Sequence, residues 1–246
     1  MASLNETLGL ARSIAIYYGR PWKTRAARRF YSAMIRPGDL VFDIGAHVGS
    51  RSRVFSKLGA HVVAVEPQPL FFRFLTKTQP ANVILRDYAV GAQAGEANLH
   101  ISSRHPTVST LSADWIDGVR TDPGFGAVNW DGTHRVKVTT LDAMIAEHGL
   151  PRFCKIDVEG FEADVLRGLS RPIPCIAFEY LPAVLDRAET CVNLIAQLGD
   201  YRFNRVRGES FTFASRNWVP AATMIEHLKL LRSSRSSGDI YARLVA

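Results

Sequence analysis

Short apolar runs alternate with helix-spaced stretches through the middle of the chain. The apolar runs predict five strands: Leu40–Ile44, His61–Val65, Val83–Leu85, Phe153–Asp157 and Cys175–Glu179. Apolar residues at helical spacing predict the helices between them: about Gly49–Leu58, Leu70–Thr78, Leu141–Glu147 and Glu162–Leu169. Strands that are apolar almost throughout are buried on both faces. The pattern therefore indicates an α/β fold, with a mainly parallel sheet covered by helices on both sides.

The N-terminal segment has a different pattern. Residues 4–35 are helix-spaced, and Pro21 breaks them into two parts. The Arg-Pro-Gly sequence at 36–38 marks a boundary. We therefore expect a basic N-terminal helical extension, residues 1–36, followed by a main domain, residues 37–246.

Further strands are predicted outside the regular alternation. Glu96–Ser102 has the pattern of an extra strand, and Asp239–Leu244 that of a last one. Tyr201–Arg207 and Glu209–Ala214 predict a hairpin around Gly208.

Residues 103–135 have little periodicity and are rich in residues that break regular structure. These are Pro106, Pro123, Gly118, Gly124 and Gly126. A loop of this length inside a compact domain is usually a lid or a binding loop. Its place between the third and fourth core strands predicts a lid or substrate loop over the active-site edge.

The charge is concentrated at the start of the chain. Of the formal net charge of +7, residues 1–36 carry +6, because Glu6 is their one acid against seven basic side chains: Arg12, Arg20, Lys23, Arg25, Arg28, Arg29 and Arg36. Such a face could meet nucleic acid, an anionic membrane surface or a phosphorylated substrate, or it could simply be solvated.

Length and composition exclude several classes of protein. The 246 residues suit one large domain or a domain with an appendage, and no apolar run is long enough for a transmembrane helix. The apolar stretch Ile14–Tyr18 is too short for a signal peptide. The widely spaced Cys154, Cys175 and Cys191 suggest reduced thiols, so we expect a cytoplasmic protein.

The first predicted strand runs into a glycine-bearing turn, Val41-Phe-Asp-Ile-Gly-Ala-His-Val-Gly-Ser50. Open parallel sheets bind ligands beyond the carboxyl ends of their strands, and this turn supplies the floor. Gly45 permits a sharp turn and close backbone approach, whereas Gly49 is expected to let the next helix pack close to the sheet. The N-terminus of that helix offers free N–H groups to an anionic part of the ligand.

The residues that this turn lacks exclude several classes of ligand. A dinucleotide fingerprint would need glycine where His47 and Ser50 stand, and no Walker sequence is present. This argues against a dehydrogenase and against nucleotide hydrolysis. S-adenosylmethionine has no pyrophosphate, so it tolerates the looser pattern.

Two acids at strand ends support a cofactor of the adenosine type. Glu66 ends the second strand 21 residues after Gly45, the place from which a carboxylate accepts hydrogen bonds from both ribose hydroxyls. Asp87 follows the third strand, within reach of an adenine amino group. The alternatives are a surface glutamate before the turn residue Pro67, and a turn-forming aspartate.

The fourth strand places charge where a sheet is normally apolar. Lys155 and Asp157 share one face of it, and Cys154 and Ile156 the other. Burying the two charges is costly unless they pair with each other or with a neighbouring acid, which fits an active-site edge.

With these residues, the sequence resembles the FkbM-type methyltransferases, a branch of the class I S-adenosylmethionine-dependent enzymes. The matching stretches are Asp43-Ile-Gly-Ala-His-Val-Gly49, Val65-Glu66-Pro67, Asp87-Tyr-Ala-Val-Gly91, Ser109-Thr-Leu111, Lys155-Ile-Asp-Val-Glu-Gly160, Val165-Leu-Arg-Gly168 and Phe178-Glu179. The chain departs from the family at His47, where asparagine is usual, and at Asp87, where it is frequent.

The resemblance implies a Rossmann-like seven-stranded sheet with a reversed last strand, S-adenosylmethionine as cofactor, and methyl transfer to a hydroxyl of a sugar, glycolipid, polysaccharide or polyketide-like molecule. It assigns cofactor binding to Asp43, Gly45, Ala46, His47, Gly49, Glu66, Pro67 and Asp87. Catalysis is expected from Asp157, Glu159 and Glu179, with Asp157 favoured as general base and His47 as a further candidate. Those three acids offer hard oxygen ligands, but no spacing demands a metal, and we predict none.

Substrate contacts are expected in the lid. Ser109 matches a family position, and Trp115, like Trp130, offers an aromatic face to a sugar ring. The alternatives are a turn-forming serine and packing within the lid.

Two other classes of function stay open. A nucleic-acid methyltransferase could use the basic segment, but the acids of Asp157-Val-Glu-Gly160 would repel a polyanion, and the aromatic turn used for base-amino methylation is absent. The second class is a non-catalytic relative of the fold that binds a nucleoside without turnover. We expect a small-molecule or glycan acceptor, with a possible peripheral contact between residues 1–36 and an anionic membrane surface.

Overall fold

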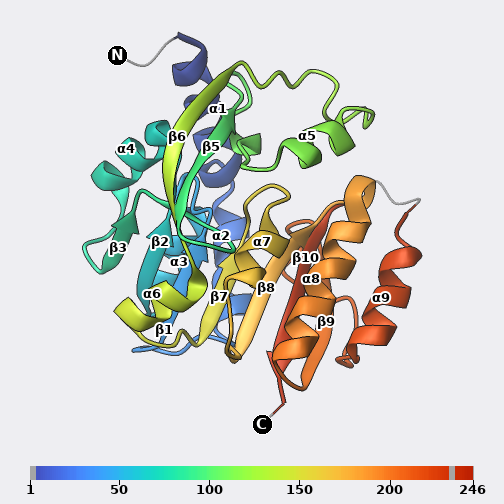
Figure 1. The fold of residues 1–246 in the computed structure, drawn as a ribbon. Helices are drawn as coiled ribbons and strands as arrows, with labels where there is room; N and C mark the ends of the chain where they lie inside the picture. Colours follow the sequence, from blue (N-terminus) through green and yellow to red (C-terminus); the bar gives the residue numbers. More distant parts are fainter. Residues whose placement is uncertain (1–3, 233–235, 246) are drawn as a thin grey trace.

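A seven-stranded sheet forms the centre of the computed structural model, which describes residues 4–232 and 236–245 (Figure 1). In sheet order the strands are β3 (Val83–Arg86), β2 (His61–Val65), β1 (Leu40–Ile44), β7 (Phe153–Ile156), β8 (Cys175–Tyr180), β10 (Gly238–Leu244) and β9 (Tyr201–Arg207). The pairs among β3, β2, β1, β7 and β8 are parallel, whereas β10 is antiparallel to both β8 and β9. The predicted α/β sheet with a reversed last strand is confirmed.

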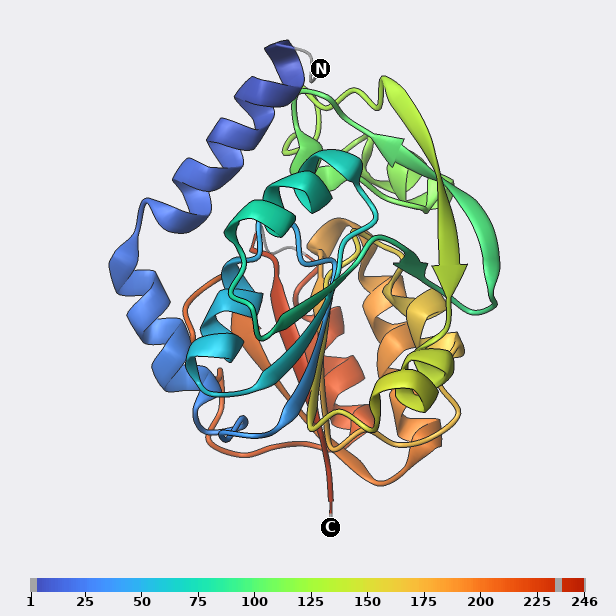
Figure 2. The ribbon, with the colours of Figure 1, turned by 90° about the vertical axis from the view of Figure 1, so that its left-hand side faces the viewer.

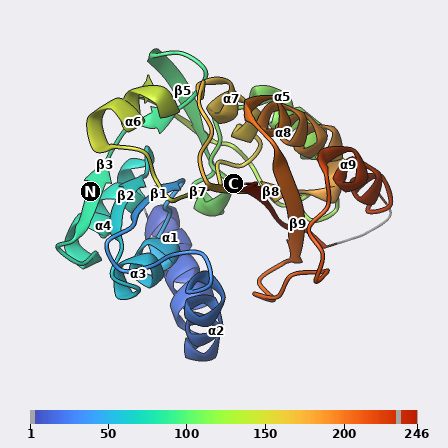
Figure 3. The same cartoon turned by 90° about the horizontal axis from the view of Figure 1, so that it is seen from below.

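Helices cover both faces of this sheet (Figure 3). One face carries α2 (Pro21–Tyr31), α3 (Ser50–Lys57) and α4 (Pro69–Thr78), and the other α6 (Leu141–His148), α7 (Glu162–Arg167), α8 (Leu185–Leu198) and α9 (Ala221–Lys229). Neighbouring residues of one strand enter opposite cores: Val41 packs with α2 and α3, and Phe42 with α6 and α7. Burial on both faces explains why the strands are apolar almost throughout. Helices α8 and α9 are additional to the predicted elements.

The basic N-terminal segment forms two helices that break at Pro21, as predicted. α1 (Leu4–Tyr18) begins beside the lid and runs along the outside of the molecule away from it, and α2 continues on the other side of the break (Figure 2). α2 buries Phe30 and Tyr31 in the core beside β1 and β10. Part of the basic segment is therefore a layer of the main core. No helix in the described part of the chain is both long and apolar enough to cross a membrane.

The predicted lid segment and the residues beside it form a second, three-stranded sheet and a short helix; we keep the name lid for these residues, 89–139. The sheet has the order β4 (Ala89–Val90), β6 (Gly132–Thr139), β5 (Gly95–Ile101), and the connection between β5 and β6 contains η1 (Pro106–Val108) and α5 (Ala113–Val119). The predicted extra strand is confirmed as β5. The expectation of little regular structure in residues 103–135 is wrong, because this segment contains η1 and α5 and ends inside β6. Among the residues of β6 only Val136 is buried, so few apolar positions mark this strand in the sequence.

The predicted C-terminal hairpin is also wrong. β9 pairs along its length with β10, and the segment Glu209–Ala214 makes only an isolated bridge to it, between Val206 and Phe213. The rings of this segment belong to the core instead: Phe213 lies 4.8 Å from Phe30 of α2, centroid to centroid. The short 3-10 helix η2 (Pro182–Val184) follows β8.

Candidate active site

The turn after β1 lies directly against the end of β7. A Cβ on Gly45 would come within 1.8 Å of the Asp157 carbonyl oxygen, and Gly45 has a positive φ of 83°. The N–H groups of Gly45 and Ala46 both donate to the Val65 carbonyl oxygen of β2, at 2.9 Å. The turn is therefore held between two neighbouring strands, at the edge predicted to bind a ligand.

Gly49 has a different role from the predicted one. We expected it to bring α3 close to the sheet, but the space beside it is filled by α4. A Cβ on Gly49 would lie 1.9 Å from Nε2 of Gln79 and 2.7 Å from Leu75. The Gln79 amide also donates to the Gly49 carbonyl oxygen at 3.3 Å. Gly49 therefore permits close packing of two helices.

The carboxylate of Glu66 is held by backbone. It accepts hydrogen bonds from the His47 N–H at 2.7 Å and from the Gln68 N–H at 2.9 Å. Burial raises the pKa of Glu66 to about 7, although the two donors favour the charged form. Each carboxylate oxygen keeps a further lone pair, so Glu66 can still accept hydrogen bonds from a ligand.

Two cavities meet at the carboxyl edge of the sheet. The first is mostly apolar and runs over the end of β2: among the residues that line it are Ile44, Val65, Glu66, Pro67, Phe71, Leu99 and Leu111. The second is polar and runs toward α1 and β10; it includes Tyr17, Asp43, Arg51, Glu179, Glu209 and Asp239. Five residues line both: Gly45, His47, Thr107, Asp157 and Glu159. Two of the three predicted catalytic acids, Asp157 and Glu159, therefore stand at the junction, and the third, Glu179, lines the second cavity alone.

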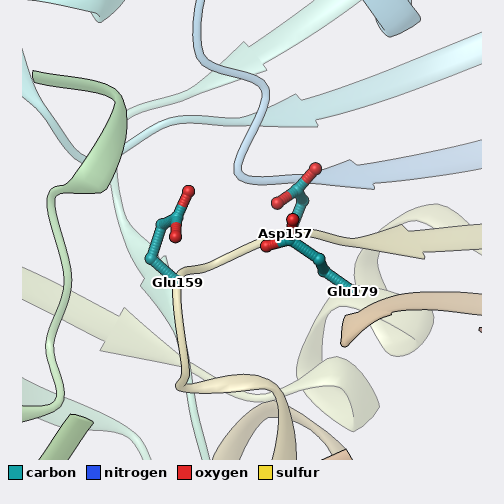
Figure 4. Close-up of side chains that lie close together, drawn as sticks. All are labelled: Asp157, Glu159 and Glu179. Atoms are coloured by element: carbon teal, nitrogen blue, oxygen red, sulfur yellow. The ribbon is translucent and has the colours of Figure 1, made fainter. Parts of the chain in front are cut away.

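Asp157, Glu159 and Glu179 form one cluster at this junction. They come from the end of β7, the loop after it and β8, and their carboxylates reach into the same space (Figure 4). One carboxylate oxygen from each of the three side chains lies within 4.8 Å of the corresponding oxygens of the other two. Burial raises the pKa of Glu159 and Glu179 well above the ordinary value, and the charge of Asp157 adds to this in both. A divalent cation would relieve the repulsion, so these three side chains are the best-placed metal ligands in the described part of the chain.

Lys155 balances part of this negative charge. Its ammonium group is 1% exposed and forms ion pairs with Asp157 at 3.1 Å and with Asp239 of β10 at 3.2 Å. Burial opposes the positive charge, but the two carboxylates outweigh it and hold the pKa of Lys155 well above its ordinary value. The predicted pairing of Lys155 with Asp157 is confirmed, and Asp239 is a partner that the sequence did not indicate.

Contacts from the lid and α8 hold the loop that carries Glu159. The Glu159 carbonyl accepts from the Thr110 hydroxyl at 2.7 Å, and the Gly160 carbonyl accepts from Arg187 at 2.7 Å. The Glu162 carboxylate accepts from the Gly160 N–H at 3.2 Å. Glu159 has a positive φ of 52°, a conformation that is uncommon outside glycine and needs such support.

His47 is placed between aromatic rings. Its imidazole lies 4.0 Å from Phe71 and 5.1 Å from Tyr17, centroid to centroid. Burial lowers its pKa to about 3, so the ring is neutral and a poor proton acceptor. Among the candidate bases, the carboxylates are therefore better suited than His47.

Asp43 lies under the second cavity. Its carboxylate is buried and accepts a hydrogen bond from the Ser52 hydroxyl, and burial raises its pKa. The structure thus brings Asp43, Gly45, Ala46, His47, Glu66 and Pro67 to the lining of one or both cavities, and their binding of a cofactor stays a prediction.

Three other predicted contacts have different surroundings. Asp87 is exposed and lines neither cavity. Ser109 lines the first cavity, and its hydroxyl donates to the Pro106 carbonyl at 2.9 Å. Trp115 is 0% exposed, so its ring is part of the lid's own core and presents no free face to a sugar. A Cβ on Gly160 would lie 2.0 Å from that ring, which shows that Trp115 supports the Glu159 loop from behind.

Sequence analysis missed the far wall of the second cavity. Arg51 of α3 forms an ion pair with Glu209 at 2.9 Å, and Lys23 of α2 reaches the same carboxylate at 2.6 Å. Tyr17 closes the cavity from α1. These side chains come from three separate parts of the chain, so no spacing pattern links them. The one local signal was Arg51 itself, at the start of the helix after the glycine turn.

Solved structures with a similar course of the chain have low sequence identity to it. The precorrin-6y C5,15-methyltransferase of Geobacter metallireducens is 14% identical, with a TM-score of 0.46 over 92% of this chain and 87% of that one. The TehB-like SAM-dependent methyltransferase of Corynebacterium glutamicum is 10% identical, with a TM-score of 0.45 over 95% of this chain and 100% of the other.

Sequence comparison identifies the family. The hexuronic acid methyltransferase AglP of Haloferax volcanii is 26% identical over 145 residues, which are 57% of this chain and 54% of that protein. The chain thus spans about half the length of this curated relative. The family model of the methyltransferase FkbM domain matches residues 43–215, which include both strands that carry the acidic cluster and the glycine turn. The chain belongs to the FkbM methyltransferase family.

Proposed function

We propose that this protein transfers a methyl group from S-adenosylmethionine to a hydroxyl oxygen of a sugar. The observation that carries the proposal is the junction of the two cavities, where Asp157 and Glu159 line both. One cavity suits a nucleoside and the other a polar acceptor. Methyl transfer requires the two substrates to meet in line at one point, with a proton acceptor beside it.

The residues of the first cavity fit the cofactor. Glu66 offers a buried carboxylate to the ribose hydroxyls, and the apolar walls of Val65, Phe71 and Leu99 suit an adenine ring. Because Gly45 has no side chain, the cofactor can approach the backbone closely there. The Asp43 carboxylate faces the second cavity, where it would favour a positively charged group of the ligand. S-adenosylmethionine, when bound, supplies a methyl group already activated by its sulfonium.

Asp157 is the proposed general base. Its carboxylate is ion-paired with Lys155 at the junction of the two cavities, and a carboxylate beside an acceptor hydroxyl can accept the proton of that hydroxyl. Glu159 and Glu179, whose pKa values are raised, hold protons more readily and can donate hydrogen bonds to the acceptor. The three side chains thus divide into one proton acceptor and two groups that orient the sugar.

The second cavity supports a polyhydroxylated acceptor. Its wall combines carboxylates, which accept hydrogen bonds, with Arg51, which donates them, and Tyr17, which can do both, so several hydroxyls can be bound at once. The relative from Haloferax volcanii is a hexuronic acid methyltransferase, which favours a sugar as the acceptor. Small-molecule and polyketide-like hydroxyls are outcomes of the same test.

Two measurements test this function. Calorimetric titration with S-adenosylmethionine, with NAD in parallel, should show binding of the first alone. Release of S-adenosylhomocysteine should then depend on an added sugar, glycolipid or polysaccharide acceptor.

The Asp157→Asn variant should lower turnover by about 100-fold or more while binding the cofactor and keeping its fold, because the amide cannot take the proton. Glu226→Gln, an exposed carboxylate of α9, is the matched control and should behave as wild type. An active Asp157→Asn protein would remove Asp157 as the base. Cofactor binding with no product from any hydroxyl acceptor would favour a nucleoside-binding protein, and methylation of RNA or DNA alone would replace the sugar.

A further inference from the structure

Exposed apolar side chains collect on the two N-terminal helices. Leu8 and Ile16 of α1 are 60% and 45% exposed, and Trp22 of α2 is 65% exposed. The other large apolar side chains with high exposure in the described residues are scattered over the rest of the chain: Ile84, Leu150, Leu230 and Val245. Only the N-terminal helices therefore hold a concentration of them that calls for an explanation.

These apolar side chains share their faces with arginines. Leu8, Arg12 and Ile16 follow one another at intervals of four residues, so they form one exposed stripe of α1. On α2, the residues Trp22, Arg25 and Arg29 form a second stripe, also exposed. No ion pair among the described residues uses Arg12, Arg25 or Arg29.

Both helices lie along one side of the molecule, with the lid at the far end of α1 (Figure 2). A tryptophan and aliphatic side chains interleaved with unpaired arginines are the composition of helices that lie in the interface of an anionic bilayer. Nucleic acid is disfavoured as the partner, because the outward stripe of α1 has a single arginine between two aliphatic side chains that a phosphate backbone cannot use.

The same face borders the proposed acceptor cavity. Ile16 lines the second cavity, and together with Gly9 and Arg12 it also lines a neighbouring groove against Pro106 and Thr107 of the lid. Thr107 in turn lines both cavities of the active site. A bilayer that binds α1 would therefore lie beside the cavity proposed to take the acceptor.

We propose that the exposed face of α1 and α2 docks on an anionic lipid bilayer and presents the acceptor cavity to sugars carried on membrane lipids. The arginines bind the anionic head groups, Leu8 and Trp22 enter the interface, and Ile16 lies at its edge beside the acceptor cavity. The docking stands independently of catalysis; the assignment of lipid-linked sugars rests on the proposed function.

Vesicle sedimentation of the full-length protein without cofactor tests the docking. The wild type should sediment with vesicles of phosphatidylcholine and phosphatidylglycerol and stay in solution with phosphatidylcholine alone. Replacing Arg12, Arg25 and Arg29 together by glutamine, or Leu8 and Trp22 together by serine, should weaken binding by about tenfold or more. Leu230→Ser and Arg216→Gln, exposed residues elsewhere, are the matched controls and should bind as wild type.

Several results would overturn the docking: no binding to anionic vesicles, equal binding by both sets of variants, binding of RNA in place of vesicles, or self-association through this face. Methyl transfer to a soluble acceptor separates the two proposals, because Leu8→Ser with Trp22→Ser should leave it unchanged. Vesicle binding without any methyl transfer would contradict the proposed function and leave the docking standing. Methyl transfer without vesicle binding would contradict the docking and leave the proposed function standing.

Discussion

At the residue scale, the junction of the two cavities holds acids whose surroundings set them apart. Asp157 has the ammonium of Lys155 at 3.1 Å, whereas no ion pair in the described residues uses Glu159 or Glu179. Burial then acts on these two without a direct counterion, and raises their pKa values. Chemically similar side chains thus differ within one small space: one is ion-paired, and the two whose pKa values are raised hold protons more readily.

Glu66 should make cofactor binding depend on pH. Its pKa of about 7 means that the carboxyl is mostly protonated below that pH and mostly ionised above it, and the ionised form accepts more hydrogen bonds from ribose. We expect the affinity for S-adenosylmethionine to rise by about tenfold between about pH 6 and about pH 8. Calorimetric titration across this range measures it. Glu66→Gln should bind more weakly and lose this pH dependence, and a variant that keeps it would show that another group titrates.

Gly160 should tolerate no side chain. It has a positive φ of 87°, and an added Cβ would lie 2.0 Å from the Trp115 ring. Gly160→Ala should therefore lower the free energy of unfolding by about 1–3 kcal/mol and displace the Glu159 loop, which reduces turnover. Urea denaturation measures the first effect. Gly95→Ala is the control, because its Cβ would meet nothing within 4 Å and its effect should stay within about 0.5 kcal/mol.

At the element scale, α1 and α2 contribute in different ways. α2 places Phe30 against Tyr241 of β10, at 5.3 Å between centroids, and its Tyr31 hydroxyl lies 3.2 Å from that of Tyr241. α1 instead contacts the active site: the Tyr18 hydroxyl donates to the Val48 carbonyl of the glycine turn at 2.8 Å. One helix is part of the core, and the other is a wall of the cleft.

This division predicts unequal effects of two aromatic substitutions in α2. Phe30→Ala should lower the free energy of unfolding by about 3–5 kcal/mol, because it leaves a cavity in the core. Trp22→Ala should change it by less than about 0.5 kcal/mol, because that ring is mostly exposed. Equilibrium denaturation in urea compares them. Similar losses in the two variants would show that α2 does not pack as described.

At the scale of the whole molecule, partly buried acids at the active site oppose folding. The ordinary pKa of a glutamate is 4.5, and in the folded protein that of Glu179 is raised well above it. Between these values the folded protein binds more protons than the unfolded chain, so the contribution of Glu179 to stability falls as pH rises. The site therefore holds a destabilising charge that substrates or a cation can offset.

Stability measurements across a pH series should show the destabilising effect of ionised Glu179. Relative to wild type, Glu179→Gln should become progressively more stable between about pH 5 and about pH 8, because it removes an acid that is forced to ionise in a buried site. Thermal denaturation of both proteins across the series measures the difference. Glu226→Gln, which alters an exposed acid, should follow the wild type at every pH, and a flat difference for Glu179→Gln would contradict its burial as an acid.

Much of the fold and of one half of the site was predictable from the sequence. The strands of the main sheet and the helices α3, α4, α6 and α7 depend on periodicity, and they were found to within a few residues at their ends, whereas α8 and α9 were missed. Gly45, Glu66 and the Lys155–Asp157 pair lie on or beside single strands, where position along the strand decides which way each side chain points. Interactions between residues close in the chain are therefore determined by the sequence itself.

The other half of the site was decided only by tertiary structure. The pairing of Asp239 with Lys155, the Arg51–Glu209 ion pair and the wall formed by Tyr17 each join segments that are distant in the chain. Trp115 has the same aromatic side chain whether it faces a sugar or the lid core, and it is packing against Gly160, Phe125 and Trp130 that buries it. Periodicity tells which face of an element is apolar, but many partners could cover that face. The choice among them comes from the docking of the whole chain.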